Sequence, residues 1–147
     1  METTGTRRLI AQPDALHRVL NSAAALQGCL PNCDSFTGSL ATGYDFALSP
    51  KIGPVTLAFR GRVTFVRAAE GQGYVMEIAG SSRLTGQIRA TLTLALTPRP
   101  RATLMDFQAT MDPSAIVRLA GAERVARAFA AGVGSFADRL KAAAELP

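Results

Sequence analysis

Three residues of the chain, His17, Cys29 and Cys33, are of types that bind metal ions. A structural zinc ion takes four ligands, usually thiolates and imidazoles at characteristic spacings. A C-x₃-C pair with one histidine twelve residues upstream leaves the fourth ligand missing. We therefore predict no metal site and two structural thiols near a turn. A regulatory disulfide or a metal contact is the alternative that the sequence leaves open.

His17 is the single histidine and the candidate general base. A general base needs an oriented nucleophile and a carboxylate, and Asp14 is a neighbour only in sequence. Asp45, Glu77 and Asp106 fall in the outward phase of their predicted strands, and no G-x-S-x-G motif occurs. We predict a half-exposed helix histidine, no catalytic residue, and a binding protein rather than an enzyme.

Tyr44 and Tyr74 fall in the inward phase of their predicted strands. Their hydroxyls could hydrogen-bond a ligand carbonyl or a substrate. They could equally be core side chains whose hydroxyls have protein partners. An enzyme acting on a small lipophilic substrate is the minority interpretation, and it would depend on such a tyrosine.

The 147-residue length predicts one domain, residues 1–147, and no apolar run approaches the length of a membrane span. The N-terminus has no signal-peptide pattern, which predicts a cytoplasmic protein. The net charge of +5 comes from dispersed arginines without interleaved aromatic residues, so nucleic acid is not predicted as a partner. The charge indicates a solvated basic surface, or else contact with an anionic membrane or an acidic partner protein.

The first third of the chain predicts one strand and two short helices. Residues 4–11 can form the strand, and Pro13 can open a helix that Asn21–Ser22 divides in two. Leu30–Pro31–Asn32 predicts a turn. After residue 33 the apolar period changes from 3.6 to 2, which predicts an antiparallel sheet with one packed face.

The predicted strands cover residues 44–48, 55–66, 74–78, 88–97 and 105–111. We expect hairpin connections at residues 71–73 and 97–100 and a corner at Gly53–Pro54. Residues 113–147 predict one long helix that Asp112 caps, with apolar residues at three- and four-residue steps.

These elements predict an α+β fold in which a curved sheet of about seven antiparallel strands wraps around the long C-terminal helix. The helix offers mainly Ala and Gly to the large side chains of the sheet. Small residues can mean close contact or an apolar cavity, and both stay open. If there is a cavity, we expect these residues to line it: Tyr44, Phe46, Leu57, Phe59, Phe65, Tyr74, Met76, Leu92, Leu94, Met105, Phe107, Ile116, Leu119, Phe129, Val133 and Phe136.

Two separated segments resemble the G-subunit family of carbon monoxide dehydrogenase, within the START-like (SRPBCC, Bet v 1-like) helix-grip superfamily. The segment LHRVLNSAAALQGCLPNCDS matches at Leu16, Leu20, Asn21, Leu26, Cys29, Leu30, Pro31 and Cys33. The segment YDFALSPKIGPVTLAFRGRVTF matches at Tyr44, Lys51, Ile52, Gly53, Pro54, Val55, Phe59 and Gly61. The chain departs from the family pattern at His17, Ser22, Ala23 and Asn32. Many members continue into an apolar anchor, whereas this sequence ends at Pro147, so we expect a tail-less or shortened member.

The resemblance implies a START-like domain that carries a hydrophobic ligand, a quinone or another lipid, and has no covalent cofactor. It also implies an accessory role to a molybdenum hydroxylase of the carbon monoxide dehydrogenase type, linking that enzyme to the membrane or respiratory chain. A recruitment or maturation module without a ligand is the alternative. The expected location is the cytoplasm, with peripheral contact at the inner face of the membrane.

Overall fold

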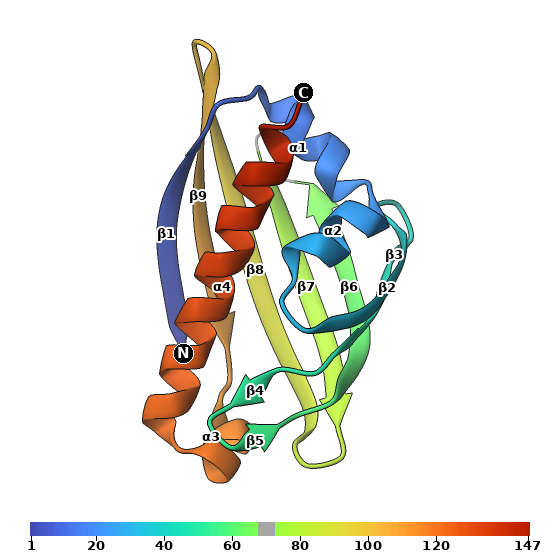
Figure 1. The fold of residues 1–147 in the computed structure, drawn as a ribbon, viewed down its shortest axis with the longest axis vertical. Helices are drawn as coiled ribbons and strands as arrows, with labels where there is room; N and C mark the ends of the chain where they lie inside the picture. The colour runs from blue at the N-terminus through green and yellow to red at the C-terminus, as the bar shows by residue number, and fades with distance from the viewer. Residues whose placement is uncertain (68–72) are drawn as a thin grey trace.

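A computed structural model describes residues 1–67 and 73–147 of the chain and shows a curved sheet around a C-terminal helix (Figure 1). The seven strands are antiparallel, in the order β1-β9-β8-β7-β6-β3-β2. Their bounds are β1 Glu2–Leu9, β2 Cys33–Ser39, β3 Gly43–Leu48, β6 Phe59–Arg67, β7 Gly73–Ser82, β8 Gly86–Arg99 and β9 Ala102–Met111. The predicted α+β helix-grip fold is confirmed.

The two short helices, α1 Pro13–Leu20 and α2 Ala23–Cys29, follow β1 as predicted. The break between them forms because the Ser22 hydroxyl accepts a hydrogen bond from the Ala25 amide and caps α2. Pro31 and Asn32 then make the predicted turn, with Asn32 at a positive φ of 57°.

β2 was not predicted as a strand because Phe36 is its only fully buried residue, so the sequence shows no alternation there. The turn between β8 and β9 lies at residues 100–101, slightly later than predicted, because β8 continues through Pro98 to Arg99. The predicted connection at residues 71–73 falls mostly outside the described residues.

The predicted continuous strand over residues 55–66 is wrong. β5 Val55–Thr56 pairs with β4 Lys51–Ile52 in a separate two-stranded hairpin, and β6 begins only at Phe59. The Leu57 amide donates to the Pro50 carbonyl at 3.0 Å and closes the base of this hairpin. The predicted corner at Gly53–Pro54 is its turn, where Gly53 has a φ of 62°.

The single helix predicted over residues 113–147 is also wrong. α3 Ser114–Ala120 ends at Gly121, whose φ of 88° and ψ of 149° are not helical, and α4 Ala122–Ala144 follows. Pro113, not the predicted Asp112, is the N-cap residue of α3, although the Asp112 carboxylate accepts from the Ser114 amide at 3.0 Å and from the Ser114 hydroxyl at 2.6 Å. The change of direction at Gly121 shifts which residues face the sheet.

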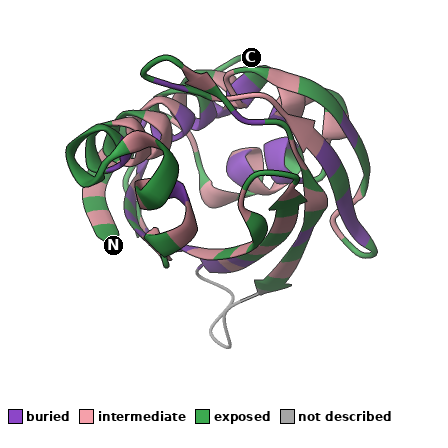
Figure 2. Cartoon of the chain, turned by 90° about the horizontal axis from the view of Figure 1, so that it is seen from below, coloured by how far each residue is buried: buried purple, intermediate pink, exposed green. Residues whose placement is uncertain are grey.

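The main core fills the space between the sheet and the helices α1, α2 and α4. A second, smaller core of Ile52, Leu57, Ile116 and Val125 joins the β4–β5 hairpin to α3 and the start of α4. Figure 2 views the molecule from this lower end and shows the strands curving around the interior.

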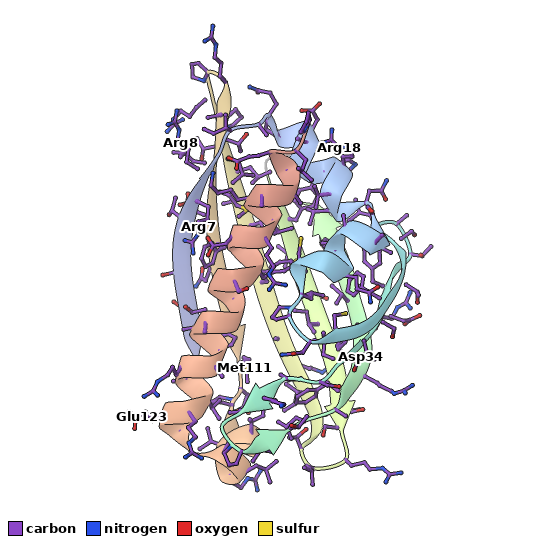
Figure 3. All side chains as sticks on the ribbon, viewed as in Figure 1. Arg7, Arg8, Arg18, Asp34, Met111 and Glu123 are labelled. Atoms are coloured by element: carbon purple, nitrogen blue, oxygen red, sulfur yellow. The ribbon has the colours of Figure 1, made fainter. Side chains whose placement is uncertain are left out.

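Polar contacts tie the edge strand β1 to α4. Arg7, which is labelled in Figure 3, donates to the Asp138 carboxylate at 2.5 Å, and its guanidinium lies 5.2 Å from the centre of the Phe107 ring. Nearer the C-terminus of α4, Lys141 donates to the Arg8 carbonyl, and Glu145 accepts from the Ile10 amide. The helix is thereby fixed along one edge of the sheet.

Candidate functional site

An apolar cavity of about 270 Å³ lies between the sheet, α2 and α4. An engineered cavity of about 150 Å³ lined by Leu, Ile and Phe stays dry and binds benzene, so this space is large enough for an apolar ring. The sheet, the α2–β2 connection, the segment after β3, and α4 all contribute. Its lining residues are Leu26, Leu30, Pro31, Phe36, Phe46, Leu48, Pro50, Val63, Met76, Ile78, Ala90, Thr91, Leu92, Ala109, Ala128, Phe129, Gly132, Val133 and Phe136.

The small residues of α4 are what leave this space open. Ala128 and Gly132 line it, and a Cβ atom added to Gly132 would meet no other atom within 4 Å. The remaining helix residues in the lining, Phe129, Val133 and Phe136, pack against the core above and below them. Of the two outcomes that the sequence left open, the structure shows the cavity.

The wall of the cavity has almost no hydrogen-bonding capacity. Thr91 is the only described lining residue with a polar side-chain atom. Throughout the described part of the chain, every buried side-chain nitrogen or oxygen already has a hydrogen-bond partner. An enclosed ligand would therefore be held by burial and shape rather than by polar recognition.

Several lining residues of the cavity are half-buried rather than buried. Among them are Ala128 and Gly132 on α4, Leu30 and Pro31 after α2, and Pro50 before β4, and we take the space between these residues as the mouth. The walls also touch each other beside the mouth. Arg139 of α4 donates to the Gly28 carbonyl at 3.4 Å, at the end of the mouth nearest α2.

Six of the sixteen predicted site residues line the cavity. They are Phe46, Met76, Leu92, Phe129, Val133 and Phe136. Leu94, Met105 and Phe107 are buried in the main core outside it. Leu57 and Ile116 belong to the second core, and Phe59 packs against both cores.

Leu119 was wrongly predicted to face inward, because it is 38% exposed. The prediction assumed one helix through residue 121. The break at Gly121 turns α3 away from the axis of α4, so Leu119 does not share the inward face of α4. That face carries the predicted Phe129, Val133 and Phe136, with Ala128 and Gly132 beside them in the cavity lining.

Tyr44 is a core residue rather than a cavity residue. Its hydroxyl is buried and donates to the Leu20 carbonyl at 2.6 Å, and its ring stacks on Phe36 at 4.7 Å between centroids. Burial raises the pKa of this phenol above its ordinary value. The hydroxyl is therefore committed to the last turn of α1.

Tyr74 and Phe65 line a different hollow, together with His17, Asn21, Leu40 and Ala41. The Tyr74 hydroxyl lies 2.6 Å from Nδ1 of His17, and the two rings stack with centroids 6.0 Å apart. His17 is half-buried, as predicted. The residues that the sequence suggested for polar chemistry thus meet, but outside the cavity.

Cys29 is buried and Cys33 is half-buried, and both are free thiols beside the predicted turn. Burial raises the pKa of the Cys29 thiol, against the opposing charge of Arg139, and burial also raises the pKa of the Cys33 thiol. Both groups therefore stay protonated at neutral pH and are poor nucleophiles.

Asp45, Glu77 and Asp106 are exposed on the outer face of the sheet, as predicted. In the described parts of the chain, no group of three or more His, Cys, Asp or Glu side chains could hold a metal ion. No helix among the described residues is both long and apolar enough to span a membrane.

Sequence reasoning placed Leu48, Val63, Ile78 and Ala90 on the inward face but did not assign them to the cavity, which they line. It missed altogether the lining residues from outside the regular alternation. Leu26, Leu30, Pro31 and Pro50 belong to a helix end and to connections, so a period of two cannot identify them. Phe36 was missed along with β2. The apolar character of the LPN turn was the one available signal for a wall at Leu30 and Pro31.

Comparison with known proteins identifies relatives by family and by fold. The family model of CoxG, the G subunit of carbon monoxide dehydrogenase, matches residues 5–145. A conserved protein from Geobacillus kaustophilus superposes with a TM-score of 0.77 at 16% identity, covering 97% of this chain and 93% of that one. A protein from Thermus thermophilus gives 0.67 at 14% identity, covering 98% and 97%. A comparison with curated proteins finds no match.

One further structure shares the fold within a longer chain. The di-domain ARO/CYC protein StfQ of the steffimycin biosynthetic pathway superposes with a TM-score of 0.66 at 16% identity. The match covers 98% of this chain and 50% of that one. At such identities these structures establish the fold alone.

Proposed function

Since the chain belongs to the CoxG family, the G subunits of carbon monoxide dehydrogenase, we propose that it binds the apolar part of a quinone or another lipid in its cavity. In this proposal it is an accessory protein of a molybdenum hydroxylase of the carbon monoxide dehydrogenase type. It works in the cytoplasm, at the inner face of the membrane, and links that enzyme to the respiratory chain.

The cavity is the observation that supports this proposal. Each CH₂ group moved from water into an apolar site contributes about 0.8 kcal/mol, so a ring with a few attached carbons gains a useful affinity. The volume of about 270 Å³ is below the range of about 300–1,000 Å³ typical of drug-sized ligands. The site therefore encloses a ring or the end of a chain, and the rest of a long isoprenoid stays at the mouth.

A filled-cavity variant tests the proposal. Gly132→Leu places a side chain in open space inside the cavity, whereas Ala131→Leu places the same side chain on the exposed face of α4. We expect menaquinone to raise the melting temperature of the unsubstituted protein and of Ala131→Leu, and to have no effect on Gly132→Leu. A ligand-free protein that menaquinone does not stabilise, or equal effects in both variants, would overturn the proposal.

Recruitment or maturation without a ligand is the second candidate, and the net charge of +5 favours it. This module would bind an acidic partner or an anionic membrane in a salt-sensitive way, and cavity filling would not affect the binding. Salt-sensitive binding that survives Gly132→Leu, with no response to menaquinone, would favour this candidate.

We propose binding rather than catalysis because the described cavity wall holds one hydroxyl, that of Thr91, and no acid or base that could activate it. Turnover of a lipophilic substrate that Tyr74→Phe abolishes, with ligand binding retained, would reverse this assignment.

A further inference from the structure

The outer face of the sheet carries a polar groove of about 420 Å³ over β6, β7 and β8. It lies on the side of the sheet that faces away from α4 and the cavity. Small residues, Ala79, Gly80 and Ser81, form its floor, and Arg60, Arg62 and Arg89 stand around it, with one carboxylate, Asp45, beside Arg62. The groove therefore combines a recessed floor with three guanidinium groups.

Strand register places these arginines on both sides of β7. Arg62 and Arg89 pair with Ala79 from opposite sides, while Arg60 pairs with Ser81, which pairs with Gln87. Neighbouring strands lie about 4.8 Å apart, so the backbones of β6 and β8 are roughly 10 Å apart across the groove. One extended peptide segment fits between the two cationic sides.

Only one of the three arginines has a counter-charge. Arg62 donates to the Asp45 carboxylate at 2.8 Å and also to the Thr42 carbonyl, which fixes its guanidinium over β3. Arg60 and Arg89 form no ion pair with any described residue. Glu77, the next outward-facing residue before Ala79 on β7, likewise forms no ion pair with any described residue. The groove thus presents two cations that the described fold does not use.

We infer that this groove is a docking site for an acidic segment of a partner protein, with Arg60 and Arg89 binding its carboxylates. A guanidinium can donate two parallel hydrogen bonds to two oxygens of one carboxylate or phosphate group. A water molecule does not offer this pair of acceptors. Ser81 and Gln87 are exposed and add neutral donors beside the arginines.

An acidic peptide segment fits this groove better than a bilayer does. The site is recessed, and none of the exposed large hydrophobic side chains of the described chain lies in it. Peripheral membrane sites combine basic residues with apolar side chains that insert into the lipid. The groove has the basic residues of such a site but no exposed large apolar side chain that could insert into lipid.

The inference rests on the proposed function only in that an accessory protein has a partner, and it does not use the cavity. The groove and the cavity mouth lie on opposite sides of the sheet. A bound ligand and a docked partner are therefore compatible in one molecule.

A fluorescent hexaglutamate peptide is the probe, with binding followed by anisotropy at low and at physiological salt. We expect salt-sensitive binding that Arg60→Gln/Arg89→Gln weakens about tenfold, because two charge-assisted contacts are lost. The matched control, Arg99→Gln/Arg101→Gln, removes two exposed arginines at the β8–β9 turn and should leave the affinity within about twofold. Equal weakening in both variants, or no peptide binding at all, overturns the inference.

Vesicles of phosphatidylglycerol and phosphatidylcholine test the lipid alternative. We expect Arg60→Gln/Arg89→Gln to leave vesicle binding unchanged, and a loss of vesicle binding without a loss of peptide binding overturns the inference. Menaquinone stabilisation and peptide binding of the unsubstituted protein separate the two proposals. In that protein, quinone binding without peptide binding removes only the docking site, and peptide binding without quinone binding removes only the carrier function.

Discussion

Tyr44 shows how one side chain completes the end of a helix. The last carbonyl groups of a helix have no partner within it, and the Leu20 carbonyl at the end of α1 accepts a buried hydrogen bond from the Tyr44 hydroxyl at 2.6 Å. The family segment around residues 16–33 and the strand segment that begins at Tyr44 thus meet at this bond. It fixes α1 against the sheet.

Tyr44→Phe should lower the free energy of unfolding by about 1–2 kcal/mol, because it leaves the buried Leu20 carbonyl without a partner. Urea unfolding followed by circular dichroism measures the change. Ring stacking on Phe36 is retained in the variant, so the effect reports the hydrogen bond. An unchanged free energy would show that the carbonyl finds another partner.

For single residues, the sequence predicted correctly which strand side chains face inward, but not which of these border the cavity. Alternation placed Phe46, Met76 and Leu92 on the inner face, where they line the cavity. The same alternation could not distinguish them from Leu94 and Met105, which are equally apolar and equally inward but lie in solid core. Which inward residues border empty space depends on the curvature of the sheet, and a period of two does not encode curvature.

Among the elements, the break between α3 and α4 is the feature that the sequence pattern concealed. Apolar residues recur at helical spacing through Gly121, so periodicity predicts a continuous helix. The glycine instead adopts a φ of 88°, a region that other residues rarely occupy. One permissive residue therefore decides the direction of the helix and the inward face of α4.

Gly121→Ala tests this role. No atom lies within 4 Å of the added Cβ, so any cost comes from the backbone conformation rather than from a clash. We expect a destabilisation of about 1–3 kcal/mol in urea unfolding, because essentially only glycine adopts a positive φ together with a ψ near 150°. Gly132→Ala is the matched control: it also meets no atom, but it lies within α4, where alanine is favoured over glycine by about 0.5–1 kcal/mol. Stabilisation by both substitutions would contradict the account.

The C-terminal end of α4 is tied to the sheet by Glu145, which gives a pH dependence. The hydrogen bonds from Lys141 at 2.5 Å and from the Ile10 amide at 2.8 Å lower the pKa of this carboxyl below its ordinary value of 4.5. A lowered folded-state pKa contributes stability above the ordinary value and loses it as the pH falls through the folded value.

The Glu145→Gln variant should therefore lose less stability than the parent as the pH falls below about 4.5. Its stability should differ most from that of the parent near neutral pH, where the variant is the less stable of the two. Melting temperatures between pH 2 and pH 7 would show the difference. Parallel curves for the two proteins would mean that Glu145 does not contribute.

For the whole molecule, two cores of unequal size imply two levels of stability. The β4–β5 hairpin pairs with no strand of the main sheet and is held mainly by Ile52, Leu57, Ile116 and Val125. The main core extends from α1 to the end of α4. Local opening begins where few buried contacts support the backbone.

Hydrogen exchange should therefore show faster exchange at residues 51–57 than at residues 90–97 in the centre of the sheet. Mass spectrometry of peptides covering the two segments measures this directly. Because Pro50 lies at the cavity mouth, opening of this hairpin would also admit a ligand, and bound menaquinone should slow the exchange at residues 51–57. Equal protection of both segments would show that the molecule opens as one unit.

The nearly complete absence of polar atoms from the cavity wall has a consequence for selectivity. A wall made almost entirely of carbon and sulfur cannot recognise a functional group by hydrogen bonding. It can only disfavour polar groups, because an unpaired hydroxyl or carbonyl inside the cavity would lose its hydration without compensation. Guests are thus ranked by how well their hydrocarbon portion fills the space. Affinity should rise with each added carbon until the cavity is filled and then stay constant. The cavity therefore selects ligands by size and shape, and any chemical selectivity would have to come from groups outside it.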